Sequence, residues 1–296
     1  MQHKDQNIAY IYAGLTILCW STVASVFKIA IARFNITSLL FIANITALSI
    51  YLLIIIISGK INLIFTGSLL SYVKSMLMGL LNPFIYYIVL IRAYALLPAQ
   101  IAQPLNFIWP ITLTLLAVPL LGYKFSFHSF AGLVISFLGV FFIASRGNIR
   151  SFKFEEPAGI LLALGSSVIW AIYWIMNVKD TRDDTIKLFL NFLFSAIYIS
   201  ILLIVTGEFQ FHLLNKSWPA IYLGIFEMGI TFLFWLKALQ VARYPDRIAN
   251  AIYLTPFISL IIIHIVLGER IYVTSVIGLF LIISGIIFQK INHKME

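Results

Sequence analysis

The sequence predicts an all-α membrane protein with ten transmembrane helices, arranged as two inverted repeats of five helices. Three observations predict this class: the composition, the lengths of the apolar segments and an internal duplication. The 296 residues are 61% hydrophobic, 15% aromatic and 10% charged, whereas a soluble domain contains about 25% charged residues. So few charges cannot cover the water-facing surface of a globule, which excludes an ordinary soluble enzyme and a disordered chain.

Ten apolar segments are long enough to cross a bilayer. A helix needs about 20 residues to span about 30 Å of hydrocarbon at 1.5 Å per residue. The first segment follows His3 and Lys4, but it is longer than the core of a secretory signal, so we interpret it as a retained helix. The predicted spans are 8–30, 38–57, 73–95, 99–121, 127–145, 157–177, 186–206, 217–240, 248–267 and 272–290.

The second half of the chain repeats the first at a shift of 146 residues. Segment 102–142 aligns with 248–288 without a gap, and Pro110 then falls on Pro256. We therefore expect two five-helix domains, 1–150 and 151–296. Because five is odd, the second domain must cross the membrane in the opposite sense to the first. Inverted repeats are typical of secondary transporters, in which the halves move about a central site, although a duplicated scaffold is an alternative.

The distribution of Lys and Arg favours both termini in the cytoplasm. Cytoplasmic loops carry an excess of these residues. With the N-terminus inside, 12 of the 20 basic residues face the cytoplasm and 8 face outward. The first half alone splits 4 to 6 and the second 8 to 2, so the second half determines the predicted orientation.

Several classes of function and ligand are excluded by missing motifs. The formal net charge is +9, but the basic residues lie mostly in short loops and form no tract interleaved with aromatics, so no nucleic-acid partner is predicted. The single cysteine, Cys19, predicts neither a disulfide nor a cysteine-based metal site. No motif for ATP binding, zinc hydrolysis or serine hydrolysis is present, so we predict no catalytic residue, cofactor or metal.

Polar and bulky aromatic residues inside the spans follow helical spacing. In the sixth span, Ser166, Trp170, Tyr173 and Asn177 lie on one face, and Asn82 and Tyr86 mark a face of the third. Since polar groups are costly in hydrocarbon, we expect these faces to line a cavity between the halves.

Interfacial anchoring or helix–helix hydrogen bonding could explain any one of these residues. Trp109, Trp170, Tyr86 and Tyr253 nevertheless lie near the middle of their spans, where interfacial aromatics are not expected. The predicted substrate-binding residues are Trp20, Ser21, Tyr86, Asn106, Trp109, Trp170, Tyr173, Glu227, Asn250 and Tyr253.

Pro110 and Pro256 occupy equivalent places in the two copies, and we predict that they act as hinges. Each proline removes one helical hydrogen bond, which would leave the carbonyls of Asn106 and Ile252 free to bind a substrate. A fixed kink that only shapes packing is the alternative.

Glu227 is the charged residue furthest from the ends of its span. A buried carboxylate could carry a proton or pair with a substrate ammonium, or simply bond a neighbouring hydroxyl. Small residues such as Gly139, Gly278 and Gly285 mark the fifth and tenth spans instead as a packing seam, between the halves or between protomers of a homodimer. The chain is therefore either a monomer or a homodimer in contact with membrane lipid.

Four sequence segments carry a resemblance to a known family. They are Leu-Cys-Trp-Ser-Thr at 18–22, Ile-Trp-Ala-Ile-Tyr at 169–173, Leu-Thr-Pro at 254–256 and Leu-Gly-Glu-Arg at 267–270. The chain resembles the drug/metabolite transporter superfamily along essentially its whole length, specifically its EamA-type members with ten helices in two repeats. The first copy departs from the family pattern because Tyr123 replaces the usual glutamate.

Three segments, 20–22, 105–110 and 253–256, are similar to the aromatic amino-acid exporter branch of that superfamily. This resemblance implies export of amino acids, including aromatic ones, or of related small metabolites across the bacterial inner (plasma) membrane by alternating access. It also implies a cavity lined by Trp20, Asn106, Trp109, Trp170, Tyr173 and Tyr253. A carrier of cationic drugs or nucleotide-like metabolites is the alternative within the superfamily, since aromatic walls also bind cations. A membrane enzyme or a scaffold without transport is the alternative outside it. A proton or another ion could couple the transport.

Overall fold

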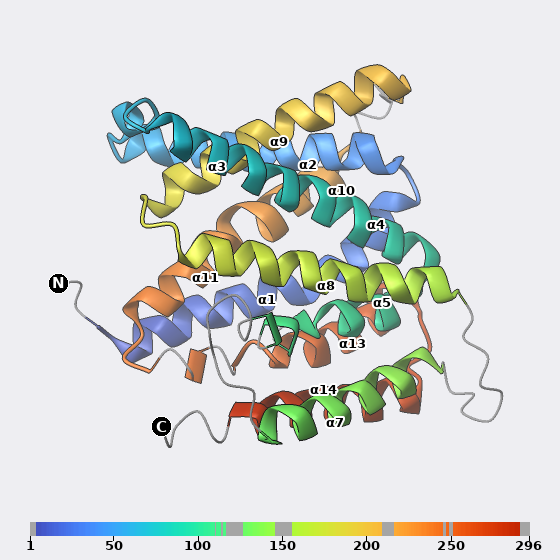
Figure 1. Ribbon diagram of the computed structural model, residues 1–296. Coiled ribbons are helices and arrows are strands. Elements are labelled where there is room, and N and C mark those ends of the chain that lie inside the picture. The colour runs from blue at the N-terminus through green and yellow to red at the C-terminus, as the bar shows by residue number, and fades with distance from the viewer. Residues whose placement is uncertain are drawn as a thin grey trace.

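The computed structural model describes residues 4–109, 111–113, 115–116, 127–145, 156–208, 216–244, 247–248 and 251–290. Every regular element within these ranges is a helix, which confirms the predicted all-α class. The helices lie roughly side by side along one direction (Figure 1). The elements of the first half are α1 (Gln6–Ile31), α2 (Ile36–Ile57), η1 (Ile61–Ile64), α3 (Leu69–Gly79), η2 (Leu80–Ile85), α4 (Tyr86–Leu96), α5 (Ala99–Asn106) and α7 (Phe127–Ala144).

The second half begins after the segment 146–155, which lies outside the described residues. Its elements are α8 (Pro157–Val178), α9 (Asp184–Thr206), α10 (Trp218–Leu223), η4 (Gly224–Gly229), α11 (Ile230–Val241), α13 (Leu254–Leu267) and α14 (Val273–Lys290).

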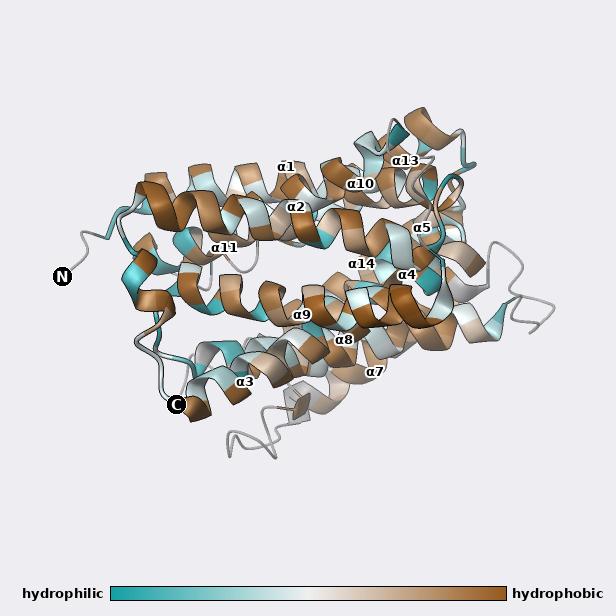
Figure 2. Cartoon of the chain, turned by 90° about the horizontal axis from the view of Figure 1, so that it is seen from above, coloured by the Kyte–Doolittle hydropathy of each residue, from teal (hydrophilic) through white to brown (hydrophobic). Residues whose placement is uncertain are grey.

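Six helical segments in the described ranges are long and apolar enough to cross a membrane, and shorter apolar helices accompany them. Figure 2 shows hydrophobic residues along the middle of the helices and hydrophilic residues gathered toward the two ends of the bundle. This is the distribution that a bilayer requires, because its core cannot solvate charge. The six segments are Gln6–Ile31, Ile36–Ile57, Leu69–Leu96, Pro157–Asn177, Asp184–Thr206 and Trp218–Val241, and the shorter helices are Phe130–Ile143, Leu254–Leu267 and Val273–Phe288.

The third and eighth spans are interrupted near their middle. In the third span, Asn82 leaves helical geometry with φ −147° and ψ 122°, and Pro83 follows without an N–H to donate. In the eighth span, Gly229 departs with φ −91° and ψ −102°. There the hydroxyl of Tyr51 donates to the carbonyls of Met228 at 2.5 Å and Gly229 at 3.2 Å. The freed backbone of the eighth span is thus satisfied by a side chain from α2.

The fourth and ninth spans are also broken, at equivalent places. Phe107 and Tyr253, which are 146 residues apart, are the turn residues, with φ/ψ of −68°/3° and −69°/−8°. The prediction that the carbonyl of Ile252 is free was wrong, because it accepts from the N–H of Thr255 at 3.0 Å. A tight turn before Pro256 supplies this donor three residues on, where a regular helix would need one four residues on.

Helices of one half pack against helices of the other in matching pairs. α1 packs against α11 and α13, and α8 packs against α4 and α5. Each of these two helices thus packs against the third and fourth spans of the opposite half, although α5 precedes the break in its span and α13 follows the break in its own. α1 begins and α14 ends at the same end of the bundle (Figure 1).

Helices α7 and α14 form a close seam at one edge of the molecule (Figure 1). A Cβ added to Gly139 would lie 2.5 Å from the carbonyl oxygen of Gly278, and one added to Gly278 would lie 2.5 Å from that of Gly139. Only glycine permits such an approach of two backbones. The predicted packing seam therefore lies between the two halves of one chain.

Candidate functional site

A pocket lies between the two halves, about midway along the helices. It is enclosed by α1, α4, α5, α8 and η4 and has a volume of about 30 Å³. That volume holds about one water molecule, whereas a bound small molecule needs about 300–1,000 Å³. A substrate can therefore enter only if the helices move apart. The pocket is lined by Trp20, Val23, Phe27, Tyr86, Leu90, Tyr94, Gln103, Asn106, Phe107, Trp109, Trp170 and Glu227.

The aromatic walls of the pocket pack on one another across the two halves. The rings of Tyr86 and Trp170 lie 4.7 Å apart between centroids, tilted by 33°. Trp170 also meets Phe232 edge to face at 5.4 Å, and Trp20 lies 6.0 Å from Trp235. Flat apolar surfaces of this kind suit stacking against another aromatic ring and attract cations.

Glu227 places a carboxyl group in this aromatic pocket. Its side chain is buried, and its Oε1 accepts a hydrogen bond of 3.0 Å from the hydroxyl of Tyr87. The indole N–H of Trp20 donates to the Glu227 carbonyl at 3.5 Å. The described residues include no basic group on the pocket wall, so the carboxyl group is available to a cation or a proton.

Amide groups complete the polar part of the pocket. The Nδ2 of Asn106 donates to Ser166 Oγ at 2.9 Å and to Tyr86 Oη at 3.3 Å. Gln103 lies one turn earlier on α5, where its Nε2 donates to the carbonyl of Trp20 at 3.4 Å and its Oε1 accepts from Ser259. The pocket therefore offers acceptors and donors beside its aromatic faces.

The structure brings six of the predicted site residues together on the pocket wall and places three elsewhere. The six are Trp20, Tyr86, Asn106, Trp109, Trp170 and Glu227. Ser21 lies between α1 and α13 and donates to the carbonyls of Ile17 and Thr255, and Tyr173 faces a second group of polar side chains. Tyr253 is a buried turn residue before α13.

The remaining predicted positions are only partly described. Asn250 and the predicted hinge Pro110 lie outside the described residues. Pro256 is buried in the first turn of α13, where its hinge role stays a prediction.

Several lining residues escaped the sequence analysis. Gln103 stands three residues before Asn106, so helical spacing of polar residues could have found it. Phe27, Tyr94 and Phe107 carried no such signal because each is one of many aromatic residues in apolar spans. Lys187, which lines a second opening at one end of the bundle, was not predicted for another reason: it lies at the start of a span, where a lysine side chain usually extends to the interface.

A wide polar opening, here named the vestibule, lies at the end of the bundle where α1 begins. It has a volume of about 900 Å³, and its charged wall is built from the loop between α8 and α9. Trp174 also lines it, and its ring lies 5.9 Å from that of Trp170 in the pocket wall. The aromatic layer thus separates the vestibule from the pocket. The charged residues that line the vestibule are Lys60, Asp180, Arg182, Asp183, Asp184, Lys187 and Lys237.

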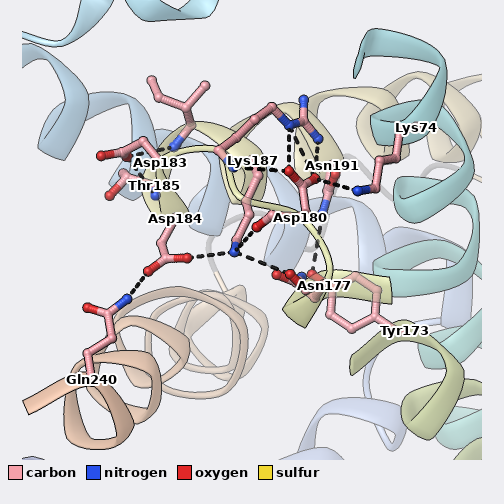
Figure 3. A network of polar contacts seen from close by, with 12 residues as sticks. Lys74, Tyr173, Asn177, Asp180, Asp183, Asp184, Thr185, Lys187, Asn191 and Gln240 are labelled. Carbon is pink, nitrogen blue, oxygen red and sulfur yellow. Dashed lines mark hydrogen bonds and ion pairs between the residues drawn. The ribbon is translucent and has the colours of Figure 1, made fainter. Parts of the chain in front are cut away.

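A hydrogen-bonded network organises the vestibule wall (Figure 3). The ammonium of Lys187 lies 2.6 Å from Asp184 Oδ1 and donates to the carbonyls of Asn177 and Asp180 at the C-terminal end of α8. Gln240 of α11 donates to the other carboxylate oxygen of Asp184. The network therefore ties α8, α9 and α11 together at the vestibule.

Asp180 and Arg182 form an ion pair with two hydrogen bonds in the vestibule wall. The guanidinium donates from Nη2 to Asp180 Oδ2 at 2.7 Å and from Nε to Oδ1 at 3.0 Å, and it also bonds Ser71 and Ser75 of α3. Burial raises the pKa of the Asp180 carboxyl, but the hydrogen bonds and charge of Arg182 and the charge of Lys74 outweigh this and lower the pKa to about 2. Asp180 is therefore ionised at neutral pH.

The opposite end of the bundle, here named the sealed end, is held shut by contacts between the two halves. Glu269, in the loop before α14, accepts from the backbone N–H groups of Ala99 at 2.9 Å and Gln100 at 3.2 Å, at the start of α5. Gln100 in turn donates to the carbonyl of Arg270 at 2.7 Å and accepts from the N–H of Tyr272 at 3.1 Å. A carboxylate at a helix N-terminus is stabilised by the unpaired N–H groups and the helix dipole.

Lys28 strengthens the same end from α1. Its ammonium donates to the carbonyls of Tyr94 at 2.8 Å and Leu97 at 3.0 Å, where α4 turns into α5. The sequence analysis assigned Lys28 no site, yet it joins α1 to the C-terminal end of α4 next to the pocket.

The pattern of an inter-half pocket with one open and one sealed end is that of a membrane carrier, and sequence comparison supports this class. A model of the EamA-like transporter family matches residues 7–145 and 157–289. The chain therefore belongs to the EamA-like transporter family, a ten-helix membrane fold, and is an integral membrane protein.

Individual relatives agree with this family at low identity. An uncharacterized transporter of Clostridium kluyveri is 28% identical over 55% of this chain and 54% of its own length. The aromatic amino acid exporter YddG of Ancylobacter novellus is 26% identical over 53% of this chain and 55% of its own. The chain thus spans about half the length of these two relatives. A crystal structure with a TM-score of 0.68 and 19% identity covers 96% of this chain and 98% of its own, which shows a shared fold.

Proposed function

We propose that this protein is a secondary transporter that exports amino acids, aromatic ones among them, or related small metabolites by alternating access. The observation that carries the proposal is the pocket between the halves, in which stacked aromatic rings, amide groups and the Glu227 carboxyl meet. Aromatic rings would hold a flat apolar side chain, the Asn106 amide would bond a carboxylate, and Glu227 would pair with an ammonium. The similarity to a protein named as an aromatic amino acid exporter supports this class of substrate.

The unequal ends of the bundle support alternating access. Substrate would enter the pocket from the vestibule once Trp170 and Trp174 move apart, and would leave when the contacts of Glu269 and Lys28 break. Export then requires the vestibule to face the cytoplasm, which agrees with the predicted cytoplasmic position of both termini in the bacterial inner membrane. A proton carried by Glu227 is the coupling that the pocket favours.

A cationic-drug carrier is the second candidate, and one observation favours it. Glu227 is a carboxyl group among the rings of Trp20, Tyr86 and Trp170, an arrangement that attracts an organic cation. Competition would separate the candidates. If amino acids displace a fluorescent cation from the purified protein, both bind in one pocket, whereas displacement by cations alone would favour the drug carrier.

Flux into proteoliposomes tests the main proposal. We expect counterflow of radiolabelled tryptophan or phenylalanine in the wild type and a loss of at least about tenfold in Trp109→Ala, which removes one pocket wall. Phe137→Ala is the matched control, since Phe137 lies exposed on α7, away from the pocket. Absence of flux for all twenty amino acids in a preparation that binds none of them would overturn the proposal.

A further inference from the structure

A second group of buried polar side chains lies beside the interruption of the third span, apart from the pocket. The amides of Asn82, Asn177 and Asn191 neighbour the hydroxyl of Tyr173, and Asn191 Nδ2 lies 3.5 Å from it. Figure 3 shows Tyr173, Asn177 and Asn191 turned toward one another. Ser195 follows one turn after Asn191 on α9. These residues of η2, α8 and α9 are named here the amide cluster.

The amide cluster contains an unusual concentration of polar atoms without partners. Within the described residues, Oδ1 and Nδ2 of Asn82, Oδ1 of Asn177, Oδ1 of Asn191 and Oγ of Ser195 are buried and make no hydrogen bond. Each parent side chain is at most 2% exposed. Burying an unpaired polar group is costly, and native proteins rarely tolerate several together without a ligand. The free atoms are chiefly oxygens, which act as acceptors.

The backbone adds a partial negative charge at the amide cluster, which favours a bound cation. α3 ends at Gly79, and the chain leaves helical geometry at Asn82, so the C-terminal end of α3 points at the cluster. A helix C-terminus carries a partial negative charge, and in transporters the interrupted ends of helices coordinate sodium ions with backbone carbonyls. Gly79 also lies against the backbone of α9 near Asn191 and Ser195, which holds η2 and α9 together.

The absence of a free carboxylate in the cluster determines which cation fits. Divalent ions are usually bound through carboxylates, but Asp180 is paired with Arg182 and Asp184 with Lys187. The nearest basic group is the ammonium of Lys187, one turn before Asn191. It is held 2.6 Å from the Asp184 carboxylate on the vestibule side, so its charge is balanced there. Neutral oxygens then suit a monovalent ion.

From this arrangement we propose that the amide cluster binds a sodium ion. Asn82, Asn177, Asn191 and Ser195 supply side-chain oxygens, and Tyr173 supplies its hydroxyl oxygen. The ion reaches the site from the vestibule, whose wall includes Asn177. Sodium binding does not depend on the transport proposal, because it requires only the folded protein.

The repeat-related position shows how the two halves differ. At the shift of 145 that aligns Gly79 with Gly224, Asn82 falls on Glu227. Gly224 lies against the carbonyl of Ala43 on α2, as Gly79 lies against α9, so the two interruptions are packed alike. The second half carries a carboxyl group that bonds Tyr87, whereas the first half carries neutral amide oxygens. One interruption thus suits a proton or organic cation, and the other suits an inorganic ion.

Thermal unfolding of the purified full-length protein in detergent tests the proposal directly. Chloride salts of sodium, potassium and choline are compared at one ionic strength. We expect saturating sodium alone to raise the melting temperature by about 2–4 °C, since a ligand bound only to the folded state stabilises it. An equal or larger rise with potassium or choline would overturn the proposal.

Variants assign the effect to the cluster. Asn82→Ala should lose the sodium response yet unfold no earlier than the wild type in choline, because it removes two unpaired polar atoms. Asn191→Asp should lower the sodium concentration of half-maximal effect by about tenfold or more through the added charge. Asn44→Ala is the control: Asn44 is a buried amide of α2 that also has an unpaired oxygen but bonds the carbonyl of Phe192, so this variant should keep the response. The assignment would be contradicted if Asn82→Ala kept the full sodium response and Asn191→Asp did not lower the sodium concentration of half-maximal effect.

Discussion

The vestibule and the sealed end are built from different contacts. At the vestibule, the charged groups of the second half bond one another and also reach the first half, where Lys60 pairs with Asp183 and Arg182 bonds α3, yet they leave a space of about 900 Å³. At the sealed end, Glu269 of the second half bonds the start of α5 in the first. A layer of aromatic rings separates the pocket from the vestibule, whereas hydrogen bonds between the halves hold the other end shut.

This difference follows from the departure between the two sequence repeats. Glu269 stands where the first copy has Tyr123, which lies outside the described residues. A tyrosine has no carboxylate with which to accept two backbone N–H groups at once. Tyr123 therefore cannot make the contact that Glu269 makes, and we expect this difference in sequence to favour one conformation over the other. Predictions about either end can be tested with one assay of access to the pocket.

The assay uses a single cysteine in the pocket wall. Val23→Cys in a Cys19→Ser background places a thiol where Val23 lines the pocket. A membrane-impermeant thiol reagent is added to one face of oriented vesicles, and the labelling rate reports access from that face.

Removal of the Glu269 carboxylate should have the largest effect. Glu269→Ala leaves two backbone N–H groups unpaired at the start of α5, at a cost of about 1–3 kcal/mol to the sealed conformation. We expect labelling from the sealed end to rise by roughly tenfold or more, since about 1.4 kcal/mol is a factor of ten. Glu208→Ala is the control, because Glu208 bonds Thr37 and not α5. Equal rates in Glu269→Ala and the control would refute the role of Glu269.

Shortening Trp174, in the aromatic layer between the vestibule and the pocket, should have the second largest effect on the labelling rate. Trp174→Ala opens the passage between the vestibule and Trp170. Labelling from the vestibule should rise several-fold, while labelling from the sealed end should stay unchanged because its hydrogen bonds remain. A rise from both ends would mean that Trp174 supports the whole bundle and does not separate the vestibule from the pocket.

Loss of the Lys28 ammonium should weaken the sealed end less than loss of Glu269. Lys28→Met keeps the aliphatic stem but removes the donors to Tyr94 and Leu97. We expect labelling from the sealed end to rise by about threefold, and Lys28→Arg to restore most of the wild-type rate. A rate in Lys28→Met above that of Glu269→Ala would reverse the proposed ranking.

The smallest effect concerns the pH dependence of stability at the vestibule. The Asp180 pKa is lowered from 3.8 to about 2 in the folded protein. The ion pair therefore stabilises the fold fully above about pH 4, and this contribution is lost as pH falls toward 2. The difference in melting temperature between wild type and Asp180→Asn should be largest near neutral pH and should shrink below pH 4. A difference that is constant from pH 7 to 3 would contradict the assigned pairing.

The bilayer explains why so much of the fold was predictable. Each span must be apolar for about 20 residues, so its position is readable from hydropathy. The turns at Phe107 and Tyr253 were harder to predict from the sequence. Pro110 and Pro256 predicted a break in each helix. Whether the carbonyl four residues before each proline finds another donor depends on the local turn and on tertiary contacts, which the sequence does not give.

The candidate site was predictable only in part because helical spacing gives a face and not its neighbour. Trp20 and Trp170 were assigned to one cavity, and they share it. Ser21 and Tyr173 looked alike in sequence, but Ser21 bonds α13 and Tyr173 faces the amide cluster. Which of two polar faces meets the pocket depends on the rotation of each helix in the bundle, and that depends on long-range packing.

Labelling of the pocket cysteine from each face of the membrane tests the central claim most directly. For Val23→Cys in the Cys19→Ser background, access through the vestibule predicts labelling from the face that carries the N-terminus and none from the opposite face. Glu269→Ala should add labelling from that opposite face. Labelling of the wild-type pocket from the Glu269 face, with no dependence on Glu269, would contradict an account in which one end is open to solute and the other is held shut.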